Sequence, residues 1–230
     1  AGAAEELTTV LNDPYASVIH RCIVLMLLGR LRARRGDPGA IDAIEESLVI
    51  AVSVDEAQCV VGARIARAEA AWLAGDLPGA ASQVEACLTY VHLLDSTHLR
   101  ELTQWAQRAG VAWAPDDVSD EATALLVAGD HGALGRFWAE RGCRYDAADA
   151  LADSDDVDDV REAFEQLTLL GARPRAQQAA RRLRELGARD VPRGPRATTR
   201  ANAAGLTARE VEVAALVADG LTNAEIADRL

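Results

Sequence analysis

Lysine is absent from the sequence, because all 24 basic residues are arginines. A Walker A phosphate-binding loop requires a lysine, and so does an active site that forms a Schiff base with its substrate. This sequence therefore excludes both kinds of site. The spacing of the other polar residues also indicates no nucleophile beside a general base, and we expect the protein not to be an enzyme.

Cysteines and long apolar runs are scarce as well. The longest apolar run, 22–28, is far shorter than the roughly 20 residues that a membrane-spanning helix requires. The first ten residues are acidic and lack the basic start of a signal peptide. We expect a cytoplasmic protein that does not contact membranes.

We also expect reduced, buried thiols at the widely separated cysteines, which are Cys22, Cys59, Cys87 and Cys143.

Recognisable metal-ligand patterns are missing too. The acidic run over 153–159 has Asp158 where an EF-hand needs glycine, and Phe164 stands where it needs glutamate. The histidines lack the i, i+4 spacing of a helical metal pair. We predict no metal and no cofactor, and we interpret the acidic run as the solvated start of a helix.

Aromatic residues make up only 4% of the chain, and the many alanines and leucines favour close-packed helices and an all-α fold. Hydrophobic residues recur at helical spacing from Val61 to Trp72 and again from Ala80 to Leu94. Arg32, Arg34 and Arg35 stand at a predicted helix end, where we expect them only to complement the helix dipole. Further helices are predicted over 17–35, 97–109, 118–128, 132–141, 145–152, 156–170 and 174–187.

A short sequence motif recurs at the helix junctions, in the stretches 36–40, 75–80 and 129–133, each of which begins with Gly-Asp. Glycine can end one helix in the left-handed conformation, and aspartate can cap the next helix. The stretch 70–90 resembles a tetratricopeptide-type repeat. The resemblance implies that residues 1–187 form a tetratricopeptide-like helical repeat superhelix, whose concave groove would receive a protein partner or a small ligand.

A plain helical bundle without a ligand is the alternative architecture. The same choice applies to the tryptophans, since aromatic side chains serve both as core residues and as anchors in binding grooves. Trp72, Trp105 and Trp138 are candidates for lining a groove, and packing in the core is the competing interpretation for each of them.

The net charge of −12 is distributed unevenly along the chain. Residues 1–168 contain 13 arginines and 29 acidic residues, whereas residues 171–204 contain nine arginines and two acidic residues. Because an acidic body repels phosphate, any DNA contact should lie C-terminal to about residue 170. The stretch 188–204 contains prolines and no hydrophobic periodicity, which predicts a flexible basic linker. Its Arg193, Arg196 and Arg200 are candidates for phosphate contacts.

The last segment, 205–230, contains two capping boxes. Thr207 precedes Glu210, and Thr222 precedes Glu225, at the spacing that lets each pair satisfy backbone amides at a helix start. Gly220 can close the first of the two short helices. Two such helices in succession are typical of the front half of a helix-turn-helix.

This segment resembles the DNA-binding domain of the LuxR (GerE) family of transcriptional regulators. The family pattern begins L-T-x-R-E and continues as G-L-[ST]-N-x-E-I-A. The matching residues are Leu206, Thr207, Arg209, Glu210, Gly220, Leu221, Thr222, Asn223, Glu225, Ile226 and Ala227. The resemblance implies that these residues form the helix-turn-helix scaffold, with Thr222 and Asn223 contacting the DNA backbone, and that the regulator is a homodimer.

The recognition helix of this family follows the position of Leu230, so we expect a C-terminal fragment that stops inside the helix-turn-helix. The helical body also resembles the repeat region of MalT-like regulators. Residues 1–187 would then receive a signal, and the complete parent protein would bind DNA. The alternative function is a helical-repeat scaffold for protein interactions with a vestigial helix-turn-helix.

Overall fold

The computed structural model describes residues 2–13, 15–116, 118, 120–189, 208–218, 225–226 and 229. They belong to two units, residues 1–189, which we call the helical body, and residues 190–230. The described residues form helices and no strand, which confirms the predicted all-α class. None of the helices in these ranges is long and apolar enough to cross a membrane.

Most helices of the body begin and end within a few residues of the predicted positions, but those over 2–11 and 40–54 were not predicted. They are α1 (Gly2–Leu11), α2 (Val18–Arg35), α3 (Ala40–Val54), α4 (Ala57–Ala74), α5 (Leu77–Cys87), the 3-10 helix η1 (Leu88–Leu93), α6 (Ser96–Ala109), α7 (Glu121–Ala128), α8 (His131–Glu140), α9 (Arg144–Leu151), α10 (Val157–Leu169) and α11 (Arg173–Glu185). The second unit contains α13 (Ala208–Ala218).

The recurring Gly-Asp motif does mark helix junctions. Its glycines, at positions 36, 75 and 129, end α2, α4 and α7 with φ angles of 69°, 86° and 70°. Asp76 caps α5 by accepting a hydrogen bond from the amide of Gly79, and Asp130 caps α8 by accepting one from the amide of Ala133. Short left-handed turns therefore connect helices that pack side by side.

The first junction differs from the prediction, because Asp37 does not cap the next helix. Gly39 occupies the N-cap position of α3, and Asp37 accepts hydrogen bonds from Arg35 at 2.8 Å and from Arg173 at 2.6 Å. The Arg173 Nε also donates to the backbone carbonyl of Arg35 at 2.6 Å. This junction therefore connects the start of α11 to the end of α2, although the two are far apart in the sequence.

Neighbouring helices approach closely where glycine faces a large side chain. A Cβ atom on Gly29 of α2 would lie only 2.4 Å from Cγ1 of Ile44 on α3. A Cβ atom on Gly135 of α8 would lie 2.5 Å from the side chain of Leu151 on α9. Because real Cβ atoms do not approach other atoms so closely, both helix pairs depend on a position without a side chain.

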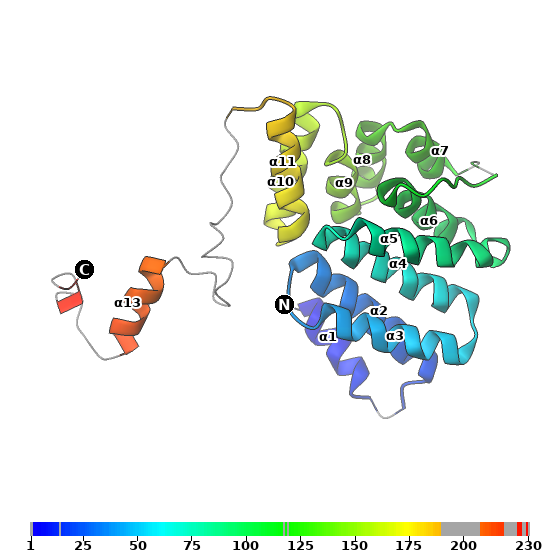
Figure 1. Ribbon diagram of the computed structural model, residues 1–230, viewed down its shortest axis with the longest axis horizontal. Coiled ribbons are helices and arrows are strands. Elements are labelled where there is room, and N and C mark those ends of the chain that lie inside the picture. Colours follow the sequence, from blue (N-terminus) through cyan, green and yellow to red (C-terminus); the bar gives the residue numbers. More distant parts are fainter. Residues whose placement is uncertain are drawn as a thin grey trace. The chain divides into compact units, whose positions relative to one another are not determined.

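The body curves back on itself rather than extending as an open row of helices. Consecutive helices from α1 to α6 and from α7 to α11 pack against each other, and α11 also contacts α2 and α4 (Figure 1). The last helix of the body therefore returns to helices near its start.

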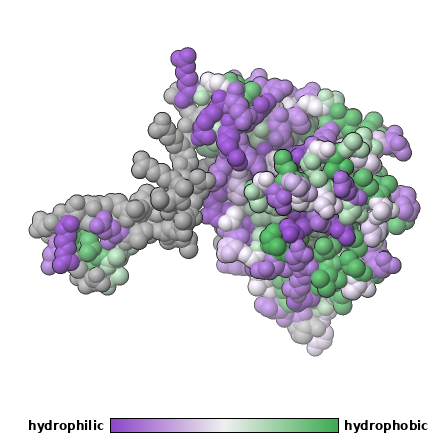
Figure 2. Space-filling model, viewed as in Figure 1, coloured by the Kyte–Doolittle hydropathy of each residue, from purple (hydrophilic) through white to green (hydrophobic). Residues whose placement is uncertain are grey.

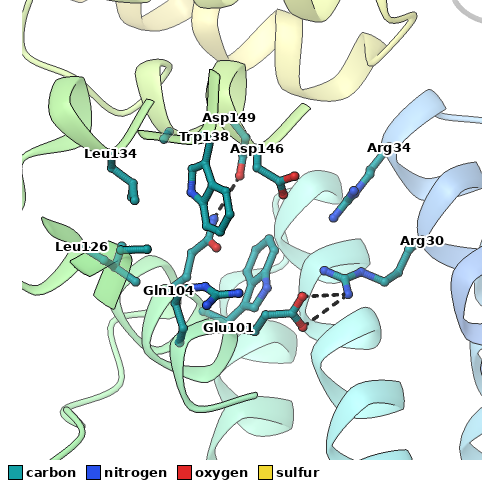
Figure 3. Close-up of a pocket in the computed structure, with 13 residues that line it drawn as sticks. Arg30, Arg34, Glu101, Gln104, Leu126, Leu134, Trp138, Asp146 and Asp149 are labelled. Carbon is teal, nitrogen blue, oxygen red and sulfur yellow. Dashed lines mark hydrogen bonds and ion pairs between the residues drawn. The ribbon is translucent and has the colours of Figure 1, made fainter. Parts of the chain in front are cut away.

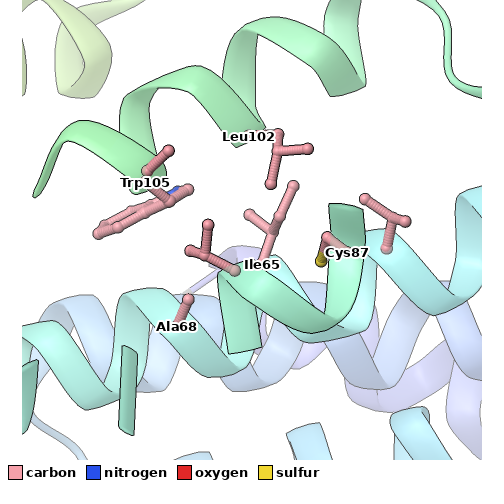
Figure 4. Packing of buried hydrophobic residues seen from close by; sticks show 8 residues of the cluster. Ile65, Ala68, Cys87, Leu102 and Trp105 are labelled. Atoms are coloured by element: carbon pink, nitrogen blue, oxygen red, sulfur yellow. The ribbon is translucent and has the colours of Figure 1, made fainter. Parts of the chain in front are cut away.

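A hydrophobic core cluster joins α4, α5 and α6 (Figure 4). The periodic positions from Val61 to Ala68 and from Ala80 to Cys87 are buried, as the spacing predicted. The cysteines are all free thiols, but only Cys22 and Cys87 are buried, whereas Cys59 and Cys143 are half-buried. On the face shown in Figure 2, hydrophilic and hydrophobic residues are intermixed over the body, as is usual for a protein surface.

Candidate functional site

Four charged side chains from distant parts of the sequence meet inside the body. We call Arg108, Asp149, Asp153 and Arg175 the four-charge cluster. Arg108 of α6 contacts Asp149 at 2.9 Å and Asp153 at 2.6 Å, and Arg175 of α11 contacts the same two carboxylates at 2.6 Å each. Each guanidinium thus bridges two carboxylates, and each carboxylate bridges two helices.

The electrostatics of the cluster favour the charged state of its two carboxylates. Burial alone would raise the pKa of Asp149, but the guanidinium groups of Arg108 and Arg175 outweigh burial and hold this pKa well below its usual range. The pKa of Asp153 is lowered in the same way, with burial again opposing the effect. Removing one partner from such a buried pair leaves an uncompensated charge, which typically costs about 3–5 kcal/mol of stability.

Trp72 of α4 lies against this cluster. The guanidinium carbons of Arg108 and Arg175 are 4.8 Å and 4.9 Å from the centre of its ring, within the range of cation–π attraction. The ring of Trp72 also meets that of Trp105 edge to face, with 5.7 Å between the centroids. The tryptophan therefore connects the hydrophobic core cluster to the four-charge cluster.

A second group of buried charges surrounds Glu69 of α4, whose side chain is only 2% exposed. The Nε atoms of Arg30 and Arg34, both on α2, donate to this carboxylate at 2.8 Å and 2.5 Å. Arg30 also reaches Glu101 of α6 at 3.3 Å. Although burial opposes it, attraction by the two arginines lowers the pKa of Glu69, so the carboxylate stays ionised.

A pocket of about 220 Å³ opens between these two groups, enclosed by α2, α6, α7, α8 and α9. Figure 3 shows Arg30 and Arg34 on one side of the pocket and Leu126 and Leu134 on the opposite side. Asp146, Trp138 and Gln104 are among the other lining residues. The pocket is therefore amphipathic, with a charged wall and an apolar wall.

The tryptophans predicted as groove residues separate into two groups. Trp105 and Trp138 line this pocket, whereas Trp72 is placed against the four-charge cluster and the ring of Trp105. Trp105 also belongs to the hydrophobic core cluster and is only 3% exposed. This residue therefore both packs in the core and lines the pocket.

The charged residues of the site were not recognised in the sequence. Arg34 was expected only to complement a helix dipole, but it binds buried Glu69 and stacks over Tyr145 with 4.0 Å between guanidinium carbon and ring centre. Asp153 was expected to be part of a solvated helix start, but it binds Arg108 and Arg175. Asp156, by contrast, does cap α10 through the amides of Asp158 and Asp159.

Only part of the predicted helix-turn-helix is described. Helix α13 begins at Ala208, directly after the predicted cap Thr207, and contains Arg209 and Glu210. Glu225 is exposed and Ile226 is buried. Outside the described residues lie the other predicted contact and scaffold positions, which are Arg193, Arg196, Arg200, Leu206, Thr207, Gly220, Leu221, Thr222, Asn223 and Ala227.

No curated protein and no solved structure matches the chain. Residues 204–230 match the family model of the bacterial regulatory proteins of the luxR family. The matched range contains both capping boxes and all of α13, and it excludes the helical body. This match supports a LuxR-type helix-turn-helix at the C-terminal end of the sequence, and with it a role in DNA-binding transcription regulation.

Proposed function

We propose that the helical body is the signal-receiving and interaction region of a LuxR-family transcriptional regulator. The observation that carries this proposal is the match of residues 204–230 to the luxR family. The complete parent protein would bind DNA through that segment, in the bacterial cytoplasm, as a homodimer that reads paired half-sites. We propose no catalytic step for the chain.

The distribution of charge along the sequence supports DNA contacts C-terminal to about residue 170. The acidic residues are concentrated in 1–168, whereas 171–204 is strongly basic, so phosphate would be attracted to that stretch rather than to the acidic part of the body. The body would then be free to bind a small ligand or a protein partner. Its amphipathic pocket supports the first of these two occupants.

The repeat region of MalT-like regulators is the architecture that we propose for the body. The left-handed glycine turns at the junctions and the side-by-side packing of consecutive helices support it. The return of α11 to α2 and α4 makes this body more closed than a simple row of repeats.

DNA binding tests the regulator proposal directly. The experiment is fluorescence anisotropy at two salt concentrations, using DNA selected from a random library, with this chain and with a version extended through any coding sequence that follows Leu230. We expect the extended version to prefer one sequence over random DNA by roughly 10³-fold or more. Salt-sensitive binding without sequence preference, in both versions, would contradict the proposal.

A pair of asparagine variants provides the matched control. Asn223→Ala removes a residue of the luxR pattern, whereas Asn202→Ala changes an asparagine of the predicted linker outside that pattern. We expect the first variant to weaken DNA binding and the second to leave it unchanged. Equal effects of the two changes would indicate that the pattern residues do not contact DNA.

A further inference from the structure

Four of the six charged residues that line the pocket are hydrogen-bonded to other residues of the protein. Arg30 and Arg34 donate to Glu69, Glu101 accepts from Arg30, and Asp149 accepts from Arg108 and Arg175. Two lining groups of opposite sign are the exceptions among the described residues, namely the guanidinium of Arg100 and the carboxylate of Asp146.

Arg100 of α6 is held in place without using its hydrogen-bond donors. Its nearest carboxylate oxygen, on Asp120, lies 3.7 Å away, and that same oxygen accepts hydrogen bonds from the hydroxyl and the amide of Thr123. The guanidinium carbon lies 5.1 Å from the ring centre of Trp138. The side chain is 20% exposed, and no acceptor of the described residues lies at hydrogen-bond distance from its donors, which leaves them to water or to a ligand.

Asp146 of α9 is the second exception, and its charge is opposite to that of Arg100. No other described residue forms a hydrogen bond with its carboxylate, which is partly exposed to solvent and which Figure 3 shows between Trp138 and Arg34. Burial raises the pKa of Asp146, and the attraction of Arg34 only partly offsets this effect. In its charged form the carboxylate therefore depends on water rather than on donors of other described residues.

The rest of the pocket limits the size and the character of a ligand. Ala122, Leu126 and Leu134 provide an apolar wall beside Trp138. A volume of about 220 Å³ is smaller than the roughly 300–1,000 Å³ of drug-sized ligand sites. A molecule that fits would have one short apolar group and very few polar groups.

From these observations we propose that the pocket binds a small zwitterion with an apolar side chain, its anionic group on Arg100 and its ammonium group on Asp146. The class includes free apolar amino acids and short peptides. The inference rests on the proposed signal-receiving role and names the class of signal. The ammonium would supply donors to the carboxylate, the anion would accept from the guanidinium, and the side chain would lie against the leucines.

Isothermal titration calorimetry with matched probes tests the two charges separately. L-leucine is compared with 3-methylbutan-1-amine, which lacks the carboxylate, and with 4-methylpentanoate, which lacks the ammonium. Two further probes, 5-aminopentanoate and the dipeptide Leu-Leu, vary the spacing of the charges and distinguish a free amino acid from a peptide. We expect a zwitterion to bind at least about tenfold more tightly than either singly charged analogue.

Variants locate the binding within the structure. Arg100→Gln and Asp146→Asn should each weaken binding of the best zwitterion at least about tenfold. Two control variants should not, namely Arg136→Gln, which also has a 3.7 Å ion contact, and Asp42→Asn on the exposed surface of α3. Without ligand, Asp146→Asn should raise the melting temperature, because partial burial disfavours the charged form of this carboxylate. A purely structural role of this carboxylate predicts a lower melting temperature instead.

The proposal is overturned if no zwitterion of the panel binds, if a singly charged analogue binds as tightly, or if both pocket variants bind like the parent protein. Calorimetry uses the whole chain and no DNA, whereas the test of the regulator proposal uses DNA and no ligand. Loss of one result therefore leaves the other unaffected.

Discussion

Arg175 on α11 contacts Asp149 on α9 through two separate hydrogen bonds. Its Nε donates to the carboxylate at 2.6 Å, and its Nη2 donates to the backbone carbonyl of the same residue at 2.8 Å. The guanidinium is only 3% exposed, so this contact is shielded from salt and water. It attaches α11, the last helix of the body, to α9, which is one of the helices that line the pocket.

The first prediction concerns the stability that this contact provides. Arg175→Ala should lower the free energy of unfolding by about 3–5 kcal/mol, because it leaves the buried Asp149 and Asp153 with one guanidinium. Urea denaturation monitored by circular dichroism measures the change. Arg182→Ala on the same helix is the control, since its partner Asp155 is 94% exposed and the loss should stay below about 1 kcal/mol. Equal losses would show that the buried cluster does not stabilise the body.

The second prediction concerns acid. Asp149, Asp153 and Glu69 have pKa values lowered by their arginine partners against the opposing effect of burial. Below their unfolded-state values of about 3.9 and 4.3, the unfolded chain binds more protons than the folded one. The free energy of unfolding should therefore be nearly constant from pH 7 to about 5 and fall steeply below about pH 4.

Denaturant titrations at fixed ionic strength and a series of pH values test this dependence. Asp146 acts in the opposite direction, because burial raises its pKa and its ionisation costs stability as pH rises through the folded-state value. The stabilising effect of Asp146→Asn should thus be present at pH 7 and absent well below about pH 4. A free energy of unfolding that stays constant down to pH 3 would contradict the prediction.

The third prediction concerns the contact between α2 and α3. Gly29→Ala should destabilise the body by about 1–3 kcal/mol, because its Cβ atom would overlap Ile44. Gly2→Ala is the control, since nothing lies within 4 Å of the Cβ position on Gly2 of α1. That variant should be neutral or slightly more stable, as alanine favours helix. Thermal unfolding of the two variants distinguishes overpacking from a general effect of glycine removal.

The fourth prediction concerns the basic linker. Replacing Arg193, Arg196 and Arg200 together by glutamine should weaken DNA binding equally for all sequences. The slope of log K against log salt concentration should become less steep by about 3, because each phosphate contact contributes about 0.9. Anisotropy titrations over a range of salt concentrations give the slope. An unchanged slope with weaker binding would place the phosphate contacts elsewhere.

Much of the fold was predictable because helix periodicity and capping are local. The hydrophobic spacing around Val61 and Val84 predicts which faces are buried, and the glycines of the junctions predict where α2, α4 and α7 end. The exception at Asp37 has a long-range cause, since Arg173 binds this carboxylate from the other end of the body.

The site was much less predictable, because its residues come together only through the return of α11. Arg30 and Arg34 are on α2, whereas Arg175 is on α11, and none of these three arginines has an acidic residue at helical spacing on its own helix. An arginine of this kind looks like any surface arginine in the sequence. One available signal was the density of arginine and acid on helices that are otherwise rich in alanine.

The four-charge cluster also sets a limit on how the body can fold. Helical repeats usually interact only with their neighbours, so that a few repeats can form independently of the others. Here Asp149 and Asp153 are fully compensated only when α6 and α11 are both in place. The body should therefore unfold in a single transition. A fragment that ends before Arg175 should unfold less cooperatively than the complete body.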